Sequence, residues 1–342
     1  MSLITGKLFP ELRQLEVLIG QLGNRAQVQI LDNIHYRGQT FPIYCIILGS
    51  KNPAVPVLGL FGGVHGLEKI GSEVILAYMQ TLSQLLDWDE ELNARLEKSR
   101  LVFVPIVNPV GVYRNTRSNG NNVDLMRNAP IEGIGNTKLY SGQRISPILP
   151  WYRGDTLAME AEAQVLCKIV RQQLFSAPLS IALDLHSGFG LRDRLWFPYA
   201  HSKKPFASIA QTYALKKLFD RCYPQHIYKI EPMSLEYVIN GDLWDFLYDE
   251  FMAHSDSQRL FIPLTLEMGS WSWLRKNPLH LFHRHGLFHP VLPHRQQRVM
   301  RRHFTLLDFL HRSLLFPKPW ADLDTEQQNC YYQQALGLWY DG

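Results

Sequence analysis

Four short and almost uninterrupted apolar segments constrain the fold of this 342-residue chain more than any other feature. They lie at residues 55–61, 101–107, 179–185 and 262–266. A strand with one face in water alternates apolar and polar residues, whereas a strand covered on both faces is apolar throughout. Helical patterns separate several of these segments. The sequence therefore predicts an α/β sandwich around a buried, mostly parallel or mixed sheet.

Two further strands are expected at residues 28–31 and 44–48. Three helices are expected at residues 72–86, 155–175 and 296–315. The segment 112–151 is rich in Asn, Gly, Pro and Arg and has little periodicity, which is typical of a functional loop or of a disordered segment. We expect one catalytic domain over residues 1–316. Residues 317–342 form a polar and aromatic tail whose structure the sequence does not indicate.

The composition is that of a soluble protein with a sizeable core, because 46% of the residues are hydrophobic and 19% are charged. A net charge of +4 is small for this length and gives no argument for nucleic acid or an anionic membrane surface as a partner. No apolar run reaches the roughly 18 residues of a membrane span. The first residues lack a secretory pattern, and the four cysteines lie far apart. We therefore expect a cytoplasmic protein, whose oligomeric state the sequence does not reveal.

Two histidines and one glutamate follow predicted strands and form a candidate metal site. His65 and Glu68 come directly after segment 55–61, and His186 follows segment 179–185. Ligands of α/β sheets bind beyond the carboxyl ends of strands. Two imidazoles and a carboxylate are a known catalytic zinc set, which leaves a position for water, lowers the pKa of that water and polarises a carbonyl. Asp184, on the same strand face as His186, is expected either to orient that imidazole or to cap a loop.

Further polar residues suggest catalytic and substrate-binding roles. Glu267 ends an apolar strand, where a lone acid needs a partner or a function. It is interpreted as a general base, with a buried ion pair as the alternative. Arg114, Arg117 and Arg127 lie in the polar loop. A guanidinium there stabilises a developing oxyanion or binds a substrate carboxylate, or else is a solvated surface charge.

Five sequence blocks in the same order resemble the M14 zinc metallocarboxypeptidase family. They are GGVHGLEKIGSE, NPVGVYRNTRSNGNNVDLMRN, WYRGDTLAMEAE, DLHSG and TLEMG, and they extend over about residues 57–270. The resemblance implies a three-layer α/β/α sandwich with a mixed, roughly eight-stranded sheet. It also implies one Zn²⁺ ion, held by the three metal-ligand candidates.

The resemblance implies roles for single residues as well. Glu267 resembles the catalytic glutamate, Arg114 the arginine that polarises the scissile carbonyl, and Arg127 the arginine that binds the terminal carboxylate of the substrate. Two positions depart from the family pattern. Met126 stands where members commonly carry Asn, which weakens the case for strict C-terminal exopeptidase action. Tyr237 is the best match for the tyrosine that covers the substrate.

These observations predict a zinc-dependent hydrolase that cleaves a peptide or peptide-like amide bond next to a carboxylate-bearing residue. One alternative is an N-acyl amino acid deacylase of the aspartoacylase or succinylglutamate desuccinylase type, and another is a non-catalytic binding protein on this fold. A second metal site or a nucleic-acid surface is a further alternative for a histidine-rich stretch, although the arginines after it fit the solvated face of a helix. The histidines of that stretch are His280, His283, His285, His289 and His294.

Overall fold

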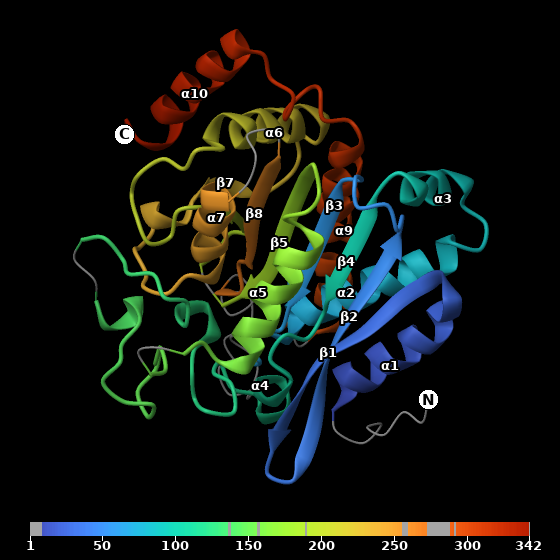
Figure 1. Ribbon diagram of the computed structural model, residues 1–342, viewed down its shortest axis with the longest axis vertical. Coiled ribbons are helices and arrows are strands. Elements are labelled where there is room, and N and C mark those ends of the chain that lie inside the picture. Colours follow the sequence, from blue (N-terminus) through green and yellow to red (C-terminus); the bar gives the residue numbers. More distant parts are fainter. Residues whose placement is uncertain are drawn as a thin grey trace.

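The computed structural model describes residues 9–135, 138–155, 158–188, 190–254, 259–271, 288–290 and 292–341. Within these residues, eight strands form one mixed sheet in the order β1-β2-β4-β3-β5-β8-β6-β7 (Figure 1). The strands are β1 (Ala26–Tyr36), β2 (Gln39–Gly49), β3 (Val57–Gly62), β4 (Arg100–Val104), β5 (Leu179–Ser187), β6 (Arg194–Phe197), β7 (Lys229–Pro232) and β8 (Leu260–Met268). The mixed sheet expected from the sequence is confirmed.

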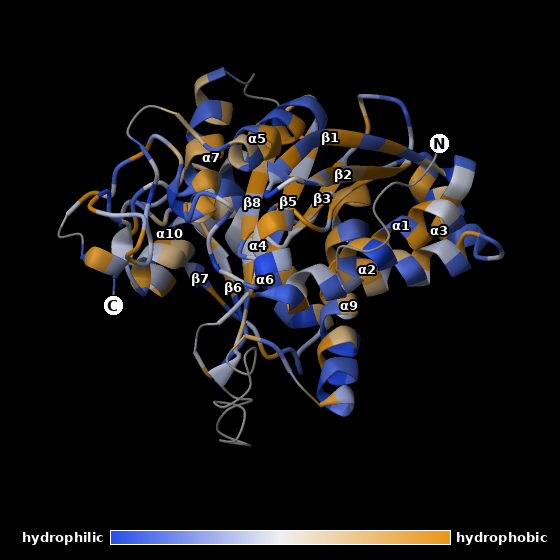
Figure 2. Cartoon of the chain, turned by 90° about the horizontal axis from the view of Figure 1, so that it is seen from below, coloured by the Kyte–Doolittle hydropathy of each residue, from blue (hydrophilic) through white to orange (hydrophobic). Residues whose placement is uncertain are grey.

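Helices cover both faces of this sheet. They are α1 (Pro10–Leu22), α2 (Lys69–Leu85), α3 (Glu90–Glu97), α4 (Pro109–Arg114), α5 (Ala161–Gln173), α6 (Ile209–Cys222), α7 (Leu243–His254), α9 (Pro293–Leu315) and α10 (Thr325–Trp339). In Figure 2, α5 and α7 lie on one side of the sheet and α1, α2 and α9 on the other. None of the described helices combines the length and the apolar character needed to cross a bilayer. The three-layer α/β/α sandwich is therefore confirmed.

The central strands carry the apolar segments on which the fold prediction was based. β4, β3, β5 and β8 are parallel neighbours. Every residue of β3, β4 and β5 is buried, because helices cover both faces. Antiparallel pairs flank this centre, with β2 beside β4 and β6 beside β8. The carboxyl ends of the parallel strands consequently meet at one edge of the sheet.

All three predicted helices begin at other residues than the observed ones. The helix predicted at residues 72–86 begins earlier, at Lys69. The helix predicted at residues 155–175 begins only at Ala161, because the backbone of Glu160 is extended. The helix predicted at residues 296–315 begins earlier, at Pro293. Proline fits the first helical position, since its fixed φ suits the helix and its missing N–H would be unpaired there.

The C-terminal tail is folded onto the rest of the chain. Helix α10 packs against α6, and Trp320, Ala335 and Trp339 belong to the same hydrophobic core as the central strands. The indole of Trp320 donates to the Ser313 carbonyl at 2.9 Å, and that of Trp339 donates to the Ile230 carbonyl at 3.0 Å. Residues beyond 316 therefore contribute to the core of the sandwich, which the sequence did not indicate.

Candidate metal centre

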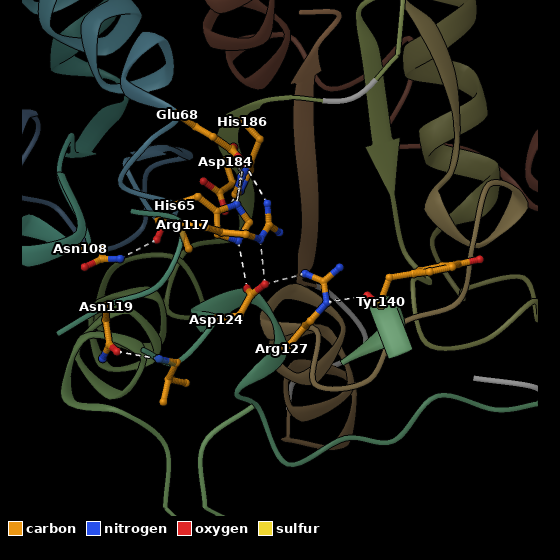
Figure 3. A network of polar contacts seen from close by, with 12 residues as sticks. His65, Glu68, Asn108, Arg117, Asn119, Asp124, Arg127, Tyr140, Asp184 and His186 are labelled. Carbon is orange, nitrogen blue, oxygen red and sulfur yellow. Dashed lines mark hydrogen bonds and ion pairs between the residues drawn. The ribbon is translucent and has the colours of Figure 1, made fainter. Parts of the chain in front are cut away.

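The carboxyl edge of the central strands brings together side chains from distant parts of the sequence. His65 and Glu68 follow β3, His186 lies near the end of β5, and Glu267 lies near the end of β8. His186 and Glu267 are direct neighbours in the register of β5 and β8. Asp124 reaches the same edge from the loop between α4 and α5 (Figure 3). Parallel strand ends thus place these groups around one point.

Glycines allow the tight turn that carries the first two candidate ligands. Gly63 has a φ of 64°, in the left-handed region that a side chain disfavours. A Cβ atom on Gly66 would lie 1.9 Å from the carbonyl carbon of Gly111, because α4 packs directly against the turn. Asn108 links the two segments, since its side chain accepts from Gly111 N at 2.8 Å and donates to the Val64 carbonyl at 3.1 Å.

Three side chains converge with their ligand atoms in reach of one cation (Figure 3). His65 Nδ1 lies 3.0 Å from Glu68 Oε1, and His186 Nδ1 lies 3.0 Å from Glu68 Oε2. The two Nδ1 atoms are 3.2 Å apart. In the part of the chain that the structure describes, no second group of His, Cys, Asp and Glu side chains converges in this way.

The neighbours of the two imidazoles determine which nitrogen faces the centre. His65 Nε2 lies 3.0 Å from Asp124 Oδ1, and His186 Nε2 lies 2.8 Å from Asp184 Oδ2. A carboxylate accepts hydrogen bonds only, so the contact with Asp124 favours the proton of His65 on Nε2 and directs the lone pair of its Nδ1 inward. His186 and Asp184 make an ion-pair contact that lacks the geometry of a hydrogen bond. Two imidazoles and one carboxylate are a donor set that fits Zn²⁺.

Several buried acids surround the candidate ligands. Glu68, Asp124 and Asp184 are buried, and Asp124 pairs with Arg117 and Arg127. Glu68 pairs with Arg117 as well. Isolated buried charges are expensive, so acids at such a site need cationic partners, and a divalent metal would be one of them.

The pKa values follow from the same arrangement. Burial alone would raise the pKa of Asp124, but Arg117, Arg127 and His65 hold it well below its usual range. Burial lowers the pKa of His186, whereas the carboxylates beside it raise that pKa well above its usual value. In both cases the oppositely charged neighbours outweigh burial and favour the ionised form of the group.

Two of the three predicted arginines reach the centre through a shared acid. Arg117 donates from Nε to Asp124 Oδ2 at 2.9 Å and from Nη1 to Glu68 Oε1 at 3.2 Å. Arg127 donates from Nη1 to Asp124 Oδ2 at 3.0 Å and from Nε to the Tyr140 carbonyl at 3.1 Å. Asp124 therefore couples one histidine and two arginines (Figure 3).

Arg114 does not reach the centre, contrary to the expectation from the sequence. It is the last residue of α4, and Asn115 then turns the chain with a φ of 58°. The Arg114 guanidinium donates to the Asn119 carbonyl at 3.2 Å and to Asn122 Oδ1 at 3.3 Å, and it lies 5.4 Å from the centre of the Tyr36 ring. Arg117, three residues later in the chain, contacts Asp124 and the candidate ligand Glu68 instead.

The candidate ligands line a cavity of about 590 Å³. Its lining residues are His65, Glu68, Arg117, Met126, Arg127, Tyr140, Pro150, Trp151, His186, Ser187, Gly188, Trp196, Met233, Glu236, Tyr237, Ile239, Asp242, Thr265, Glu267 and Phe288. The predicted residues Glu267 and Tyr237 are among them. The Tyr237 ring lies 5.9 Å from that of Tyr140 and 6.3 Å from that of Trp196, centre to centre. One wall of the cavity is therefore aromatic.

Three acids of the site were missed in the sequence, namely Asp124, Glu236 and Asp242. Asp124 stands between Val123 and Leu125, and this apolar setting was the available signal of a buried acid. Asp242 caps α7, since its Oδ1 accepts from the backbone N of Trp244 at 2.9 Å. An aspartate before a helix is expected as an N-terminal cap, so the sequence does not indicate that Asp242 also lines the cavity.

Only part of the histidine-rich stretch lies in the described residues. His280, His283 and His285 fall outside them. His289 lies 3.2 Å from Glu73 Oε1, so it pairs with α2. The described residues do not decide the alternative of a second metal site or a nucleic-acid surface in this stretch.

Comparisons with known proteins agree with this geometry. The family model of the zinc carboxypeptidases, peptidase family M14, matches residues 33–270, which is more than half of the chain. Carboxypeptidase M of Mus musculus is 27% identical over 116 residues, which cover 31% of this chain and 26% of that protein. Carboxypeptidase SOL1 of Arabidopsis thaliana is 31% identical over 93 residues, which cover 26% of this chain and 19% of that protein. The matches thus span less than a third of these relatives.

Solved structures share the fold. Bovine thrombin-activatable fibrinolysis inhibitor, in complex with tick carboxypeptidase inhibitor, has a TM-score of 0.63 at 15% identity, covering 89% of this chain and 95% of that one. Carboxypeptidase A from Helicoverpa armigera has a TM-score of 0.55 at 17% identity, covering 74% of this chain and 62% of that one. The fold shared with these structures agrees with the match to the family model. The chain belongs to the zinc carboxypeptidase family of metallopeptidases.

Proposed function

We propose that this protein hydrolyses a peptide or peptide-like amide bond next to a residue that bears a carboxylate. One observation carries the proposal: the candidate metal ligands, Glu267, Arg117 and Arg127 all line the same cavity. These groups are the parts that amide hydrolysis needs, namely a metal site, a proton acceptor and two cations for oxygen atoms of the substrate. A catalytic role for a single Zn²⁺ ion is part of this proposal.

The chemistry is divided between the metal and the protein. Zinc, when bound by His65, Glu68 and His186, supplies Lewis-acid activation of water and of the scissile carbonyl. Glu267 then acts as the general base. Its carboxylate takes a proton from the attacking water and delivers it to the leaving nitrogen. The strand pairing of Glu267 with His186 supports this role, because it keeps the base beside the ligand set.

We assign the carbonyl oxygen to Arg117 rather than Arg114. The Arg117 guanidinium is fixed by Asp124 and Glu68, and its Nη2 bonds to no described residue. A fixed donor costs no reorganisation when charge develops on the oxygen atom. Arg114 is held by loop carbonyls outside the cavity lining.

We assign the substrate carboxylate to Arg127. Its Nε and Nη1 are bonded to the Tyr140 carbonyl and to Asp124, while its Nη2 bonds to no described residue. Arginine is suited to carboxylates, because its planar group presents several donors in a fixed geometry. Met126, which also lines the cavity, offers no amide donor beside it.

The cavity favours a basic side chain on the residue that carries the carboxylate. Glu236 and Asp242 line it, and so does an aromatic wall along which an aliphatic stem packs. Burial and the neighbouring Asp245 raise the pKa of Asp242. Glu236 is already paired with Arg194, so Asp242 is the acid that an incoming ammonium or guanidinium group would ionise, and that group would lower the pKa of Asp242 again.

The alternatives are less well supported. The family match and the curated relatives are carboxypeptidases, so they do not favour an N-acyl amino acid deacylase. Membership of a metallopeptidase family also speaks against a purely binding role. A cytoplasmic location stays a prediction, as does the absence of nucleic-acid and membrane partners.

The test is a substrate panel on protein loaded with one equivalent of zinc. It contains N-blocked dipeptides ending in Lys, Leu or Glu, their C-terminal amides, and N-acetyl amino acids. We expect hydrolysis of free-acid dipeptides, with a preference for Lys. Glu267→Gln should retain zinc and lose activity by about two orders of magnitude or more. Turnover of N-acetyl amino acids alone would exclude the proposal.

Asp242→Asn tests the side-chain preference with the helix cap preserved. Asparagine caps a helix about as well as aspartate, so α7 keeps its N-terminal hydrogen bonds. The variant lacks the negative charge. We expect it to lose the preference for Lys while it hydrolyses the Leu dipeptide like the wild type. If the variant kept its preference for Lys, a group other than Asp242 would determine the specificity for the substrate side chain.

A further inference from the structure

A second buried arginine lies behind the cavity wall. The side chain of Arg153 is 3% exposed, and its guanidinium donates from Nε to the Arg127 carbonyl at 3.0 Å. Its Nη2 donates to the carbonyls of Ala129 at 3.4 Å and Ile131 at 3.0 Å, and Nη1 bonds Glu132 at 2.6 Å. The Arg153 side chain thus bonds the carbonyls of every second residue from 127 to 131 and the side chain of Glu132.

The backbone of Arg153 reinforces this contact. Its carbonyl accepts from Asn128 Nδ2 at 2.8 Å, and its N–H donates to the Gln143 carbonyl at 2.9 Å. The stem of Arg153 runs beside that of Arg127, since a Cβ atom on Gly142 would lie 3.1 Å from Cδ of both. Segment 127–132 and residues 142–153 are therefore packed around these two arginines.

Arg127 depends on this support for its orientation. Its own guanidinium is held by Asp124 and by the Tyr140 carbonyl, but the direction of its stem follows from the backbone of segment 127–132. That backbone is bound on one side by Arg153 and on the other by Gly241, whose carbonyl accepts from Ala129 N at 3.0 Å. A shift of the segment would move Arg127 relative to the cavity.

We propose that Arg153 is a positioning residue for Arg127 and, through it, sets the affinity of the cavity for the carboxylate of the substrate. The proposal rests on the proposed function, in which Arg127 binds that carboxylate. Lysine cannot replace Arg153, because its single ammonium group cannot bridge carbonyls that a planar fork reaches together. The role is indirect, since Arg153 does not line the cavity.

Arg144 provides a matched control in the same loop. It too donates to backbone carbonyls, from Nη1 to Gly154 at 2.8 Å and to Asp155 at 3.0 Å. It makes no hydrogen bond to segment 127–132 among the described residues. Arg144→Lys and Arg153→Lys both remove guanidinium bonds to backbone carbonyls, but only the second change removes bonds to segment 127–132.

The experiment measures binding of N-acetyl-L-lysine and of its carboxamide to zinc-loaded protein by calorimetry. The wild type should bind the acid about tenfold or more tightly than the amide, as expected for one charge-assisted hydrogen bond. In Arg153→Lys this ratio should approach one, with KM for free-acid dipeptides raised and kcat little changed. Arg144→Lys should behave like the wild type. A general loss of stability would not change the ratio selectively.

The possible failures are distinguishable. If the wild type itself does not prefer the acid, the assigned role of Arg127 fails and the proposed function with it. If the wild type prefers the acid and folded Arg153→Lys keeps that preference, the inference about Arg153 is overturned. Should Arg153→Lys not fold, Glu132→Lys decides, because Glu132 is 68% exposed and the new charge repels the Arg153 guanidinium. Its ratio should then fall by about threefold or more, and an unchanged ratio would refute the inference.

Discussion

Replacing Asp124 by asparagine should weaken metal binding although Asp124 is not a candidate ligand. The carboxylate accepts from His65 Nε2 on one oxygen, and from Arg117 Nε and Arg127 Nη1 on the other. Asparagine has nearly the same shape but only one accepting oxygen atom. If its amide group faces the arginines, donor meets donor. If it faces His65, the imidazole must move its proton to Nδ1, the atom that faces the metal.

In either orientation of the amide, the variant loses the carboxylate that supports His65, and metal affinity should fall. Loss of such a supporting carboxylate typically reduces metal affinity 10- to 100-fold, or about 1.4–2.8 kcal/mol. Asp124 is fully buried, so the variant also leaves two guanidinium groups short of a partner. Breaking a buried ion pair costs about 3–5 kcal/mol of folding free energy. We therefore expect the metal-free variant to unfold at a lower urea concentration.

The assay is a competitive zinc titration against a chromophoric chelator at neutral pH, with urea unfolding of the metal-free protein beside it. Asp87→Asn is the control, because Asp87 pairs with Arg25 at a site where its side chain is 63% exposed. Exposed pairs contribute about 0–1 kcal/mol and no metal affinity. A zinc affinity of Asp124→Asn within about threefold of the wild type would refute the reasoning.

Three further predictions concern other parts of the molecule. Arg117→Lys should reduce kcat/KM by about 100-fold, the effect of losing an oxyanion donor, whereas Arg114→Lys should change it less than about threefold; equal losses would contradict our assignment. Burial lowers the pKa of His303 from 6.5 to about 4, so its neutral form stabilises the fold above pH 6.5 and this stability is lost as the pH falls towards 4. Urea unfolding should show a slope of up to about 1.4 kcal/mol per pH unit from this group, and His303→Gln should flatten it. Trp320→Ala should lower the unfolding free energy by about 3–5 kcal/mol in one cooperative transition; a separate early transition would mean that the tail folds independently.

The central sheet could be predicted from the sequence, because its signals are local. An apolar strand reports burial on both faces whatever its partners are, and β3, β4 and β5 were recognised in this way. The candidate ligands could be predicted for the same reason: His65, Glu68 and His186 directly follow or end such strands. The tail was not predictable, because the burial of Trp320 depends on contact with α9 and that of Trp339 on contact with α6.

The sequence by itself thus determined the layers of the fold and the identity of the candidate metal ligands, since both follow from residue types along strands and at their ends. Only the tertiary structure decided which loop residues join them. Asn115 turns the chain after α4, so Arg117 and not Arg114 faces the centre. Asp124 joins His65, 59 residues away in the sequence, to Arg117 and Arg127 of its own loop. Hydrogen bonds between distant residues depend on the path of the backbone, and an irregular loop has no periodicity from which that path could be read.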